Sequence, residues 1–368
     1  MQISAAVARE PCKPLSIESV ELAEPQDHEV LVKMVAVGIC HSDIAARDQA
    51  LPFALPAVLG HEGAGIVEKV GSAVTRLKPG DKVVLTVPYC GHCVNCEREE
   101  ISYCENGMEL MYAGVRPDGS ATICRESENL SAHFFGQSSF ATYALSNELN
   151  AVKMKADTDL TMAAPLGCGI QTGAGAVLRS LNAQPGRALA VFGAGTVGMS
   201  AVMGGKIAGC HPIIVVEPVK ERRELALELG ATHVIDPMSG DDTVEAIRAI
   251  VPRGVDYAVD TSAVVKVLED VLAAVARHGQ VVMLGVPHNP ESVLPLSILG
   301  FLANGVTLKG VIEGDTLPDE FIPELYAWYE EGKLPLDKLI TTYDFEAINT
   351  AIEDQLAGKA IKPVLSFD

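Results

Sequence analysis

The second half of the chain alternates short apolar runs with longer amphipathic segments, the pattern of a parallel β-sheet covered by helices. Buried strands are expected at residues 188–192, 212–217, 233–235, 255–260, 280–285 and 306–311. Helices are expected between them, in a glycine-bearing segment that ends near residue 209 and at residues 241–251 and 264–277. Six strands of this kind would complete a doubly wound α/β domain.

The first half of the chain has a different hydrophobic pattern, in which apolar and polar residues alternate along valine-rich segments that are expected to be strands. Such strands are expected at residues 30–37 and 66–70 and around Val84. A chain of 368 residues exceeds what one hydrophobic core usually covers. We therefore expect a β-rich domain over residues 1–169, the doubly wound domain over 170–312, and a return at 313–368 that completes the first domain. The substrate is expected in the cleft between the domains.

Composition and charge narrow the class of protein. The chain is 48% hydrophobic and 21% charged, which is ordinary for a globular protein, and its formal net charge is −20. A nucleic-acid partner is not expected, since phosphate binding needs clustered Lys and Arg. No secretory leader is evident at the start, so a cytoplasmic location is expected. Residues 188–205 carry no charge, but their five glycines fit a strand-turn-helix unit better than a membrane span.

Nine cysteines without an export signal favour metal ligands over disulfides. Four of them, Cys90, Cys93, Cys96 and Cys104, lie within fifteen residues. Four sulfurs suit one tetrahedral zinc whose role is structural, because no coordination position stays open. A redox-active pair is the weaker alternative, and a nucleic-acid-binding zinc ribbon is disfavoured by the surrounding glutamates.

A glycine motif opens the second half of the chain. Gly193, Gly195 and Gly198, with Val197 between the last two, follow a predicted strand and open a helix, which is the arrangement that binds a dinucleotide pyrophosphate. Glu217 ends the next strand, where a carboxylate accepts hydrogen bonds from the ribose hydroxyls and would repel a 2′-phosphate. NAD is therefore expected rather than NADP, although the nearby Arg222 and Arg223 leave some tolerance of NADP possible.

Three further potential ligands, Cys40, His61 and Cys168, lie at predicted strand ends or between glycines. Each is a weak signal by itself. Together with the four-cysteine cluster and the glycine motif, the segment from Gly60-His61-Glu62 to Gly71 resembles the zinc-containing medium-chain alcohol dehydrogenases, over nearly the whole chain. A segment near Arg47 is similar to that of the aryl-alcohol, benzyl-type branch. The resemblance implies a GroES-like β-rich catalytic domain joined to a Rossmann domain, with NAD and two zinc ions per subunit.

The resemblance also implies roles for residues around the catalytic zinc. Cys40, His61 and Cys168 would bind the metal, with Glu62 as an alternate ligand and Asp43 hydrogen-bonded to the histidine. Ser42 would begin the proton relay. Many relatives end this relay at a histidine whose place is taken here by Ala45, so we expect the proton to leave through water, with Arg47 assisting or closing the site.

The remaining positions implied by the resemblance concern the cofactor and the substrate. His41 and Lys362 would contact the pyrophosphate, and Thr172 and Val286 the nicotinamide. A mostly apolar substrate pocket would be formed by Leu51, Thr86, Phe134 and Ile312. Such a pocket favours a primary aromatic or allylic alcohol, of benzyl or geraniol type, and the position of Thr86 should widen it.

Two alternative functions and one assembly state follow from the same residues. One alternative is a glutathione-linked formaldehyde dehydrogenase, which is built on this plan but needs basic residues at the mouth of the pocket. The other is a binding protein that has lost catalysis, but such a relative would be expected to lack metal ligands that are intact here. The long stretch at residues 105–139 is similar to that of dimeric members, and the strand at 306–311 would lie at a sheet edge. A homodimer is therefore expected, with a tetramer as the alternative.

Overall fold

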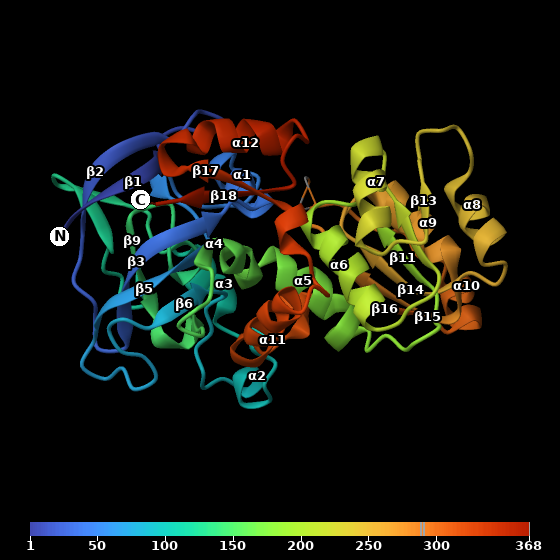
Figure 1. Cartoon of the computed structure of the whole chain (residues 1–368), viewed down its shortest axis with the longest axis horizontal. Helices are drawn as coiled ribbons and strands as arrows, with labels where there is room; N and C mark the ends of the chain where they lie inside the picture. Colours follow the sequence, from blue (N-terminus) through green and yellow to red (C-terminus); the bar gives the residue numbers. More distant parts are fainter. Residues whose placement is uncertain (288, 290, 368) are drawn as a thin grey trace. The chain divides into compact units, whose positions relative to one another are not determined.

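The computed structural model describes residues 1–287, 289 and 291–367 and divides into two compact units. The first unit comprises Met1–Cys168 and Leu317–Asp368, and the second comprises Gly169–Thr316. The second unit thus extends slightly past residue 312, the end expected from the sequence. Figure 1 shows how the C-terminal segment, drawn in red, returns to the sheets formed by the N-terminal segment.

The first unit is built from two β-sheets. The five-stranded sheet has the order β4 (Ala57–Val58), β1 (Gln2–Ala8), β2 (Ser16–Leu22), β7 (Ile123–Arg125) and β8 (Glu128–Leu130). The seven-stranded sheet has the order β10 (Ala151–Lys153), β6 (Lys82–Leu85), β5 (Glu62–Val70), β3 (Glu29–Gly38), β18 (Lys362–Ser366) and β17 (Ile340–Asp344), and β9 (Tyr143–Asn147) also pairs with β3. Because β3 pairs with both β5 and β18, the strand that starts at Glu62 and the C-terminal strand meet at the same end of β3.

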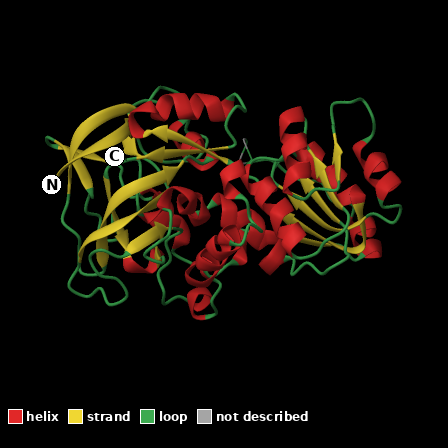
Figure 2. Cartoon of the chain, viewed as in Figure 1, coloured by secondary structure: helices red, strands yellow, loops and turns green. Residues whose placement is uncertain are grey.

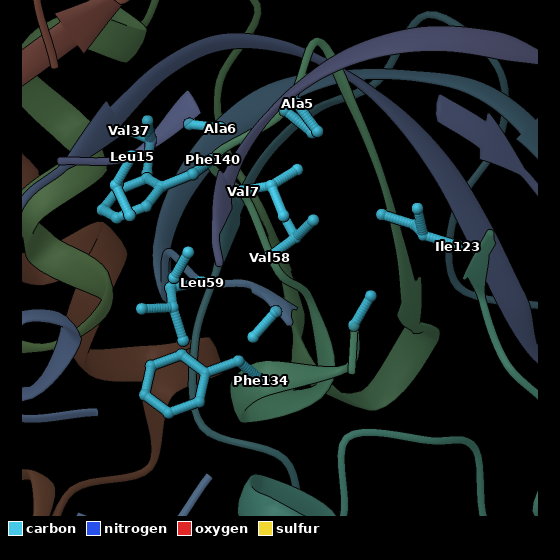
Figure 3. Packing of buried hydrophobic residues seen from close by; sticks show 14 of the residues in the cluster. Ala5, Ala6, Val7, Leu15, Val37, Val58, Leu59, Ile123, Phe134 and Phe140 are labelled. Atoms are coloured by element: carbon cyan, nitrogen blue, oxygen red, sulfur yellow. The ribbon is translucent and has the colours of Figure 1, made fainter. Parts of the chain in front are cut away.

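Apolar residues from both termini and from the middle of the chain form the main core of this unit. Figure 3 shows Val7, Val58, Leu59, Phe134 and Phe140 within this cluster. The α-helices around it are α1 (His41–Arg47), α2 (Val94–Glu97), α3 (Gly107–Tyr112), α4 (Leu160–Ala163), α11 (Pro318–Glu330) and α12 (Ile348–Leu356). Leu59 and Phe140 lie next to the strand that begins at Glu62, so the core supports the backbone that carries His61.

The second unit contains one parallel sheet with the order β13 (His233–Ile235), β12 (Ile213–Val216), β11 (Leu189–Phe192), β14 (Val255–Asp260), β15 (Val275–Met283) and β16 (Thr307–Gly310). This is the doubly wound order of a dinucleotide-binding domain. Its α-helices, red in Figure 2, are α5 (Gly169–Gly175), α6 (Thr196–Ile207), α7 (Lys220–Leu229), α8 (Thr243–Ile250), α9 (Val265–Ala274) and α10 (Ile298–Asn304).

One predicted boundary in this unit is wrong. The helix expected to continue to residue 277 ends at Ala274, and the strand expected from residue 280 begins at Val275. Val275 pairs with Val255 at once, and an irregularity then lets Gln280 pair with Tyr257. The β-branched Val275 favours the extended backbone, and His278 has a positive φ of 59°, so the residues between are neither helical nor regularly paired.

The charge-free residues 188–205 form β11 and most of α6, as their glycines indicated. Across the part of the chain that the structure describes, no helix combines the length and the apolar character needed to span a membrane.

Candidate active site

The four clustered cysteines converge in a small lobe of the first unit that contains α2. Their sulfur atoms all lie within 4.8 Å of one another. The Sγ atom of Cys93 is 3.5 Å from that of Cys96 and 4.0 Å from that of Cys104, and Cys90 is 3.9 Å from Cys96. Four sulfurs bonded to one tetrahedral zinc at about 2.3 Å would be roughly 3.8 Å apart. The cluster therefore has the dimensions of a zinc–tetrathiolate site.

The electrostatics of this lobe also favour a cation. Backbone N–H groups of Cys90 and Glu105 donate to the sulfurs of Cys104 and Cys93. Burial opposes ionisation of Cys90, but backbone donors near His92 and Cys93 outweigh it and lower its pKa to about 6. Burial and the neighbouring Cys93 raise the pKa of Cys96 to about 12. Four thiolates cannot share this volume unless a positive ion neutralises them, which is what a structural zinc would do.

A second group of ligand atoms brings together residues far apart in the chain. One ligand atom each from Cys40, His61, Glu62 and Cys168 lies within 4.8 Å of the others. Cys40 is the residue before α1, His61 immediately precedes β5, and Cys168 follows the 3₁₀ turn Ala164–Gly167. The Nε2 atom of His61 is buried and has no hydrogen-bond partner among the residues that the structure describes. A buried nitrogen without a partner, next to two thiols, is the geometry that a metal ion satisfies.

Asp43 fixes the orientation of this histidine. The Nδ1–H group of His61 donates to Oδ1 of Asp43 over 2.8 Å, which leaves Nε2 for the metal. The same carboxylate accepts the backbone N–H groups of Cys40 at 2.9 Å and Gly60 at 3.0 Å. Gly60 has a φ of 91°, and a side chain there would collide with Phe140, so only glycine fits before the histidine. One buried carboxylate thus positions two of the three expected ligands.

The charges in the site reinforce one another. A hydrogen bond with Cys168 and the nearby His61 ring hold the pKa of Cys40 well below its usual value although the thiol is buried. Burial disfavours a charge on His61, but Asp43 and Cys40 outweigh it and raise its pKa. Burial raises the pKa of Glu62, and Lys362 opposes that rise.

The structure places Lys362 beside Glu62. The residue, which was expected to contact the cofactor pyrophosphate, is only 1% exposed. Its ammonium group donates to both carboxylate oxygens of Glu62 at 2.8 and 2.9 Å and to the carbonyl of Ile39 at 2.9 Å. The pairing of β18 with β3 places it there. Burial alone would lower the pKa of Lys362, but the Glu62 carboxylate raises it. The lysine neutralises the carboxylate that adjoins the metal ligands.

Two residues expected in the substrate pocket are buried in the first unit. Phe134 has no exposed surface and packs edge-on against His61 and Phe53, so it supports the histidine from behind. Thr86 is buried as well, and its hydroxyl donates to the carbonyl of Gly167, next to Cys168. Both side chains therefore lie next to expected metal ligands, and their contact with a substrate stays a prediction.

Gln137 is a part of the site that sequence reasoning missed. Its amide nitrogen donates to the carbonyl of His61 at 2.9 Å, and its amide oxygen accepts from the backbone N–H of Gly63 at 3.1 Å. The side chain therefore clamps the backbone on both sides of Glu62. No local pattern identifies it, since Gln137 lies 74 residues beyond Gly63 in the sequence.

The second unit presents the glycine motif with the geometry of an anion-binding turn. Gly193 has a φ of 92°, which favours glycine, and a side chain on Gly198 would collide with the carbonyl oxygen of Gly193. Gly195 directly precedes α6, and a Cβ added there would meet no atom within 4 Å. The helix N-terminus is thus open at the position where a pyrophosphate binds in such domains. Val197 lies half-buried in the first turn of α6.

Glu217 follows β12 and is bonded to the same turn. Its carboxylate accepts the backbone N–H groups of Ala194 at 2.7 Å and Val219 at 2.9 Å, and these bonds leave acceptor sites for ribose hydroxyls. Arg223 donates to the carbonyls of Glu217 and Pro218 and pairs with Asp236 at 2.9 Å. Arg222 is half-buried, and within the described part of the chain its Nε atom has no hydrogen-bond partner.

The other expected residues fall into two groups. In the first unit, His41 is exposed, Ser42 and Leu51 are half-buried, and Arg47 pairs with Asp48 through two hydrogen bonds of 2.6 and 3.0 Å. In the second unit, Val286 and Ile312 are exposed, and the hydroxyl of Thr172 donates to the carboxylate of Glu313 at 3.4 Å. Glu313 did not figure in the sequence-based site.

Comparison with protein families finds two matching models. Residues 26–156 match the alcohol dehydrogenase GroES-like domain, and residues 196–331 match the zinc-binding dehydrogenase domain. The two matches cover the expected metal ligands Cys40 and His61 in the first unit and most of the doubly wound sheet in the second.

Individual relatives resemble the chain over its whole length. Geraniol dehydrogenase of Castellaniella defragrans is 44% identical over 364 residues, which cover 99% of this chain and 97% of that protein. The crystal structure of benzyl alcohol dehydrogenase from Acinetobacter calcoaceticus has a TM-score of 0.96 and 40% identity, with full coverage of both chains. An alcohol dehydrogenase zinc-binding domain protein from Burkholderia ambifaria has a TM-score of 0.97 and 45% identity, covering 100% of this chain and 99% of that one.

Proposed function

The chain belongs to the zinc-containing medium-chain alcohol dehydrogenases, and from this premise we propose that it interconverts a primary aromatic or allylic alcohol and its aldehyde with NAD. The observation that carries the proposal is the buried, unpartnered Nε2 atom of His61 beside the thiols of Cys40 and Cys168. When bound, zinc would acidify the alcohol hydroxyl and NAD would accept the hydride. The four-cysteine lobe would hold the second zinc.

The residues of this chain would orient the reactants and move the proton. Asp43 sets the direction of the His61 ring, and Lys362 keeps the negative charge of Glu62 neutralised beside the metal ligands. Ser42, in the first turn of α1, would take the proton from the alcohol. Ala45 offers no group to receive it next, so the proton would pass to water. The guanidinium of Arg47 is held by Asp48, which would leave it to close the site rather than to titrate.

The proposed substrate class rests on the relatives and on the apolar side chains available. The two relatives with printed substrates act on geraniol and on benzyl alcohol, both of them primary alcohols with a bulky hydrocarbon group. The residues proposed to contact that group are Leu51, Thr86, Phe134 and Ile312, of which Ile312 is exposed. Burying hydrocarbon against them is worth about 25 cal/mol per Å², which favours a large apolar alcohol over ethanol.

A panel of alcohols with NAD and with NADP tests this function. We expect kcat/KM for benzyl alcohol or geraniol to exceed that for ethanol by at least about a hundredfold, because several additional carbon atoms are buried. NAD should be preferred, since Glu217 would repel a 2′-phosphate. Equal or higher kcat/KM with ethanol would contradict the substrate class. A strict requirement for glutathione with formaldehyde would instead establish the glutathione-linked alternative.

We also propose that two copies of the chain associate through the edge of the six-stranded sheet. The proposed location is the cytoplasm, where thiols stay reduced and can bind zinc. Strand β16 is the last strand of that sheet, and α10 precedes it. Ile298, Leu299 and Leu302 of α10 are 86%, 76% and 76% exposed. An apolar patch beside an open strand edge is the combination that a second copy covers.

Charged residues on α10 should separate the two copies. We expect Leu299→Asp together with Leu302→Asp to convert a dimer into a monomer in size-exclusion chromatography with light scattering, because two carboxylates would lose their water in the contact. Met238→Asp is the control, since Met238 is 78% exposed and lies outside the patch. An unchanged dimer in the double variant would place the interface elsewhere.

A further inference from the structure

A strained turn follows β16 in the second unit. Glu313, Gly314 and Asp315 have φ values of 50°, 69° and 54°, so three consecutive residues occupy the left-handed region. For the two that are not glycine this costs about 1 kcal/mol or more each, and such a turn persists only where its surroundings determine it. The turn lies directly on α5, because a side chain on Gly314 would collide with Gln171 and with Gly175.

Buried polar contacts hold this turn to the helix. The side chain of Glu313 is mostly buried, and its Oε2 atom accepts from the amide of Gln171 at 2.9 Å and from the hydroxyl of Thr172 at 3.4 Å. The hydroxyl of Thr316 contacts the carbonyl of Glu313 at 2.8 Å and the amide oxygen of Gln171 at 3.2 Å. One carboxylate therefore joins two neighbouring residues of α5 to the turn.

The residues that this carboxylate holds are those expected at the reacting end of the cofactor. Thr172 is the expected nicotinamide contact, and its hydroxyl is the group that bonds to Glu313. Ile312, an expected substrate contact, immediately precedes Glu313 and is 41% exposed. The left-handed turn begins directly after Ile312, so it constrains the backbone next to that side chain.

We propose that Glu313 is a positioning residue for the nicotinamide end of the site. It acts through Thr172 and Gln171 and through the turn that presents Ile312, and it does not itself contact the reacting atoms. The proposal rests on the proposed function, because it takes Thr172 to face the nicotinamide. Neither the spacing of residues nor the glycine motif indicates this role, since Glu313 follows Thr172 by 141 residues.

The test compares variants by direct titration of NAD and by steady-state kinetics. Glu313→Ala removes the carboxylate that accepts from Gln171 and from Thr172, and we expect it to raise Kd and KM for NAD roughly tenfold with a smaller change in kcat. Glu313→Gln keeps an acceptor oxygen in place and should stay within about threefold of the unaltered protein. Thr172→Val removes one donor, and adding Glu313→Ala to it should cost less than Glu313→Ala alone.

The control is Ser180→Ala, which removes a 2.7 Å contact to Asp315 in the same turn without touching Gln171 or Thr172. An equal loss of NAD affinity in this control, an unchanged Kd in Glu313→Ala, or additive effects of Glu313→Ala and Thr172→Val would overturn the proposal. If Glu313→Ala does not fold, unchanged NAD binding by Thr172→Val would overturn it. The titration uses no alcohol, so a wrong substrate class leaves it intact, whereas failure of the unaltered protein to bind NAD would refute the proposed function itself.

Discussion

Replacing Cys168 by serine is expected to lower the zinc content from two ions to one per chain and kcat by about a thousandfold or more. The hydroxyl of serine is a poor zinc ligand, and the remaining pair of Cys40 and His61 cannot make a stable site alone. A catalytic metal supplies several kcal/mol of transition-state stabilisation, and about 4 kcal/mol corresponds to a factor of roughly a thousand. Metal analysis of the purified variant and turnover of benzyl alcohol measure the two effects.

Cys124→Ser is the matched control for this variant. Cys124 is a half-buried cysteine in the first unit and belongs to neither ligand group. It should keep two zinc ions and full turnover. The assignment of Cys168 is wrong if Cys168→Ser retains two zinc ions, or if it loses one ion and keeps its turnover. A similar loss of turnover in both variants would indicate general damage instead of a lost ligand.

The ion pair between Glu62 and Lys362 lowers the cost of a buried carboxylate beside the expected metal ligands. Two thiolates and Glu62 would place several negative charges around one dication, and a buried charge without a partner is costly. Lys362 offsets one of them through two hydrogen bonds, and Gln137 holds the backbone on both sides of Glu62. The charge of Glu62 on β5 is thus offset by Lys362 on β18, and the backbone around Glu62 is held by Gln137 from the segment before β9.

Features encoded by nearby residues were predictable from the sequence. The spacing of Cys90, Cys93, Cys96 and Cys104 predicted a cluster, and the structure gives it the dimensions of a zinc site. The alternation of apolar runs with amphipathic segments predicted a doubly wound domain with six strands, and the second unit contains such a sheet. The joining of Cys40, His61 and Cys168 needed the family resemblance, because more than a hundred residues separate the last two and each is unremarkable alone.

What could not be predicted depends on contacts between distant segments. The β18–β3 pairing carries Lys362 to Glu62, although the lysine was expected at the pyrophosphate. The family resemblance implied a pocket position for Phe134 and Thr86, but it did not indicate the burial of Phe134 in the core or the bond from Thr86 to Gly167. Glu313 reaches Thr172 through a left-handed turn that no residue pattern indicates. These residues contact or position the expected metal ligands and the expected cofactor contact.

Replacing Cys96 by serine should lower the stability of the protein and leave its turnover nearly unchanged, whereas Cys168→Ser should mainly lower turnover. Helix α2 contains no buried residue, so the cysteine lobe has little core of its own and would depend on zinc for its shape. Zinc binding contributes about 10–16 kcal/mol to the folding of small zinc peptides. If a quarter of that stabilises this unit, loss of the zinc ion would lower its free energy of unfolding by about 3 kcal/mol. For a domain of this size the melting temperature would fall by roughly 10 °C.

Calorimetry, metal analysis and turnover at low temperature together check this expectation. Cys96→Ser should hold one zinc ion and melt earlier but keep kcat within a few-fold, because Cys40, His61 and Cys168 are unaltered. Asn95→Ala is the control, since it removes the 2.7 Å bond from Asn95 to the carbonyl of Tyr103 in the same lobe without removing a sulfur. A loss of kcat as large as that of Cys168→Ser would mean that the lobe takes part in the chemistry. An unchanged melting temperature after loss of one zinc ion would show that the metal there does not support the fold.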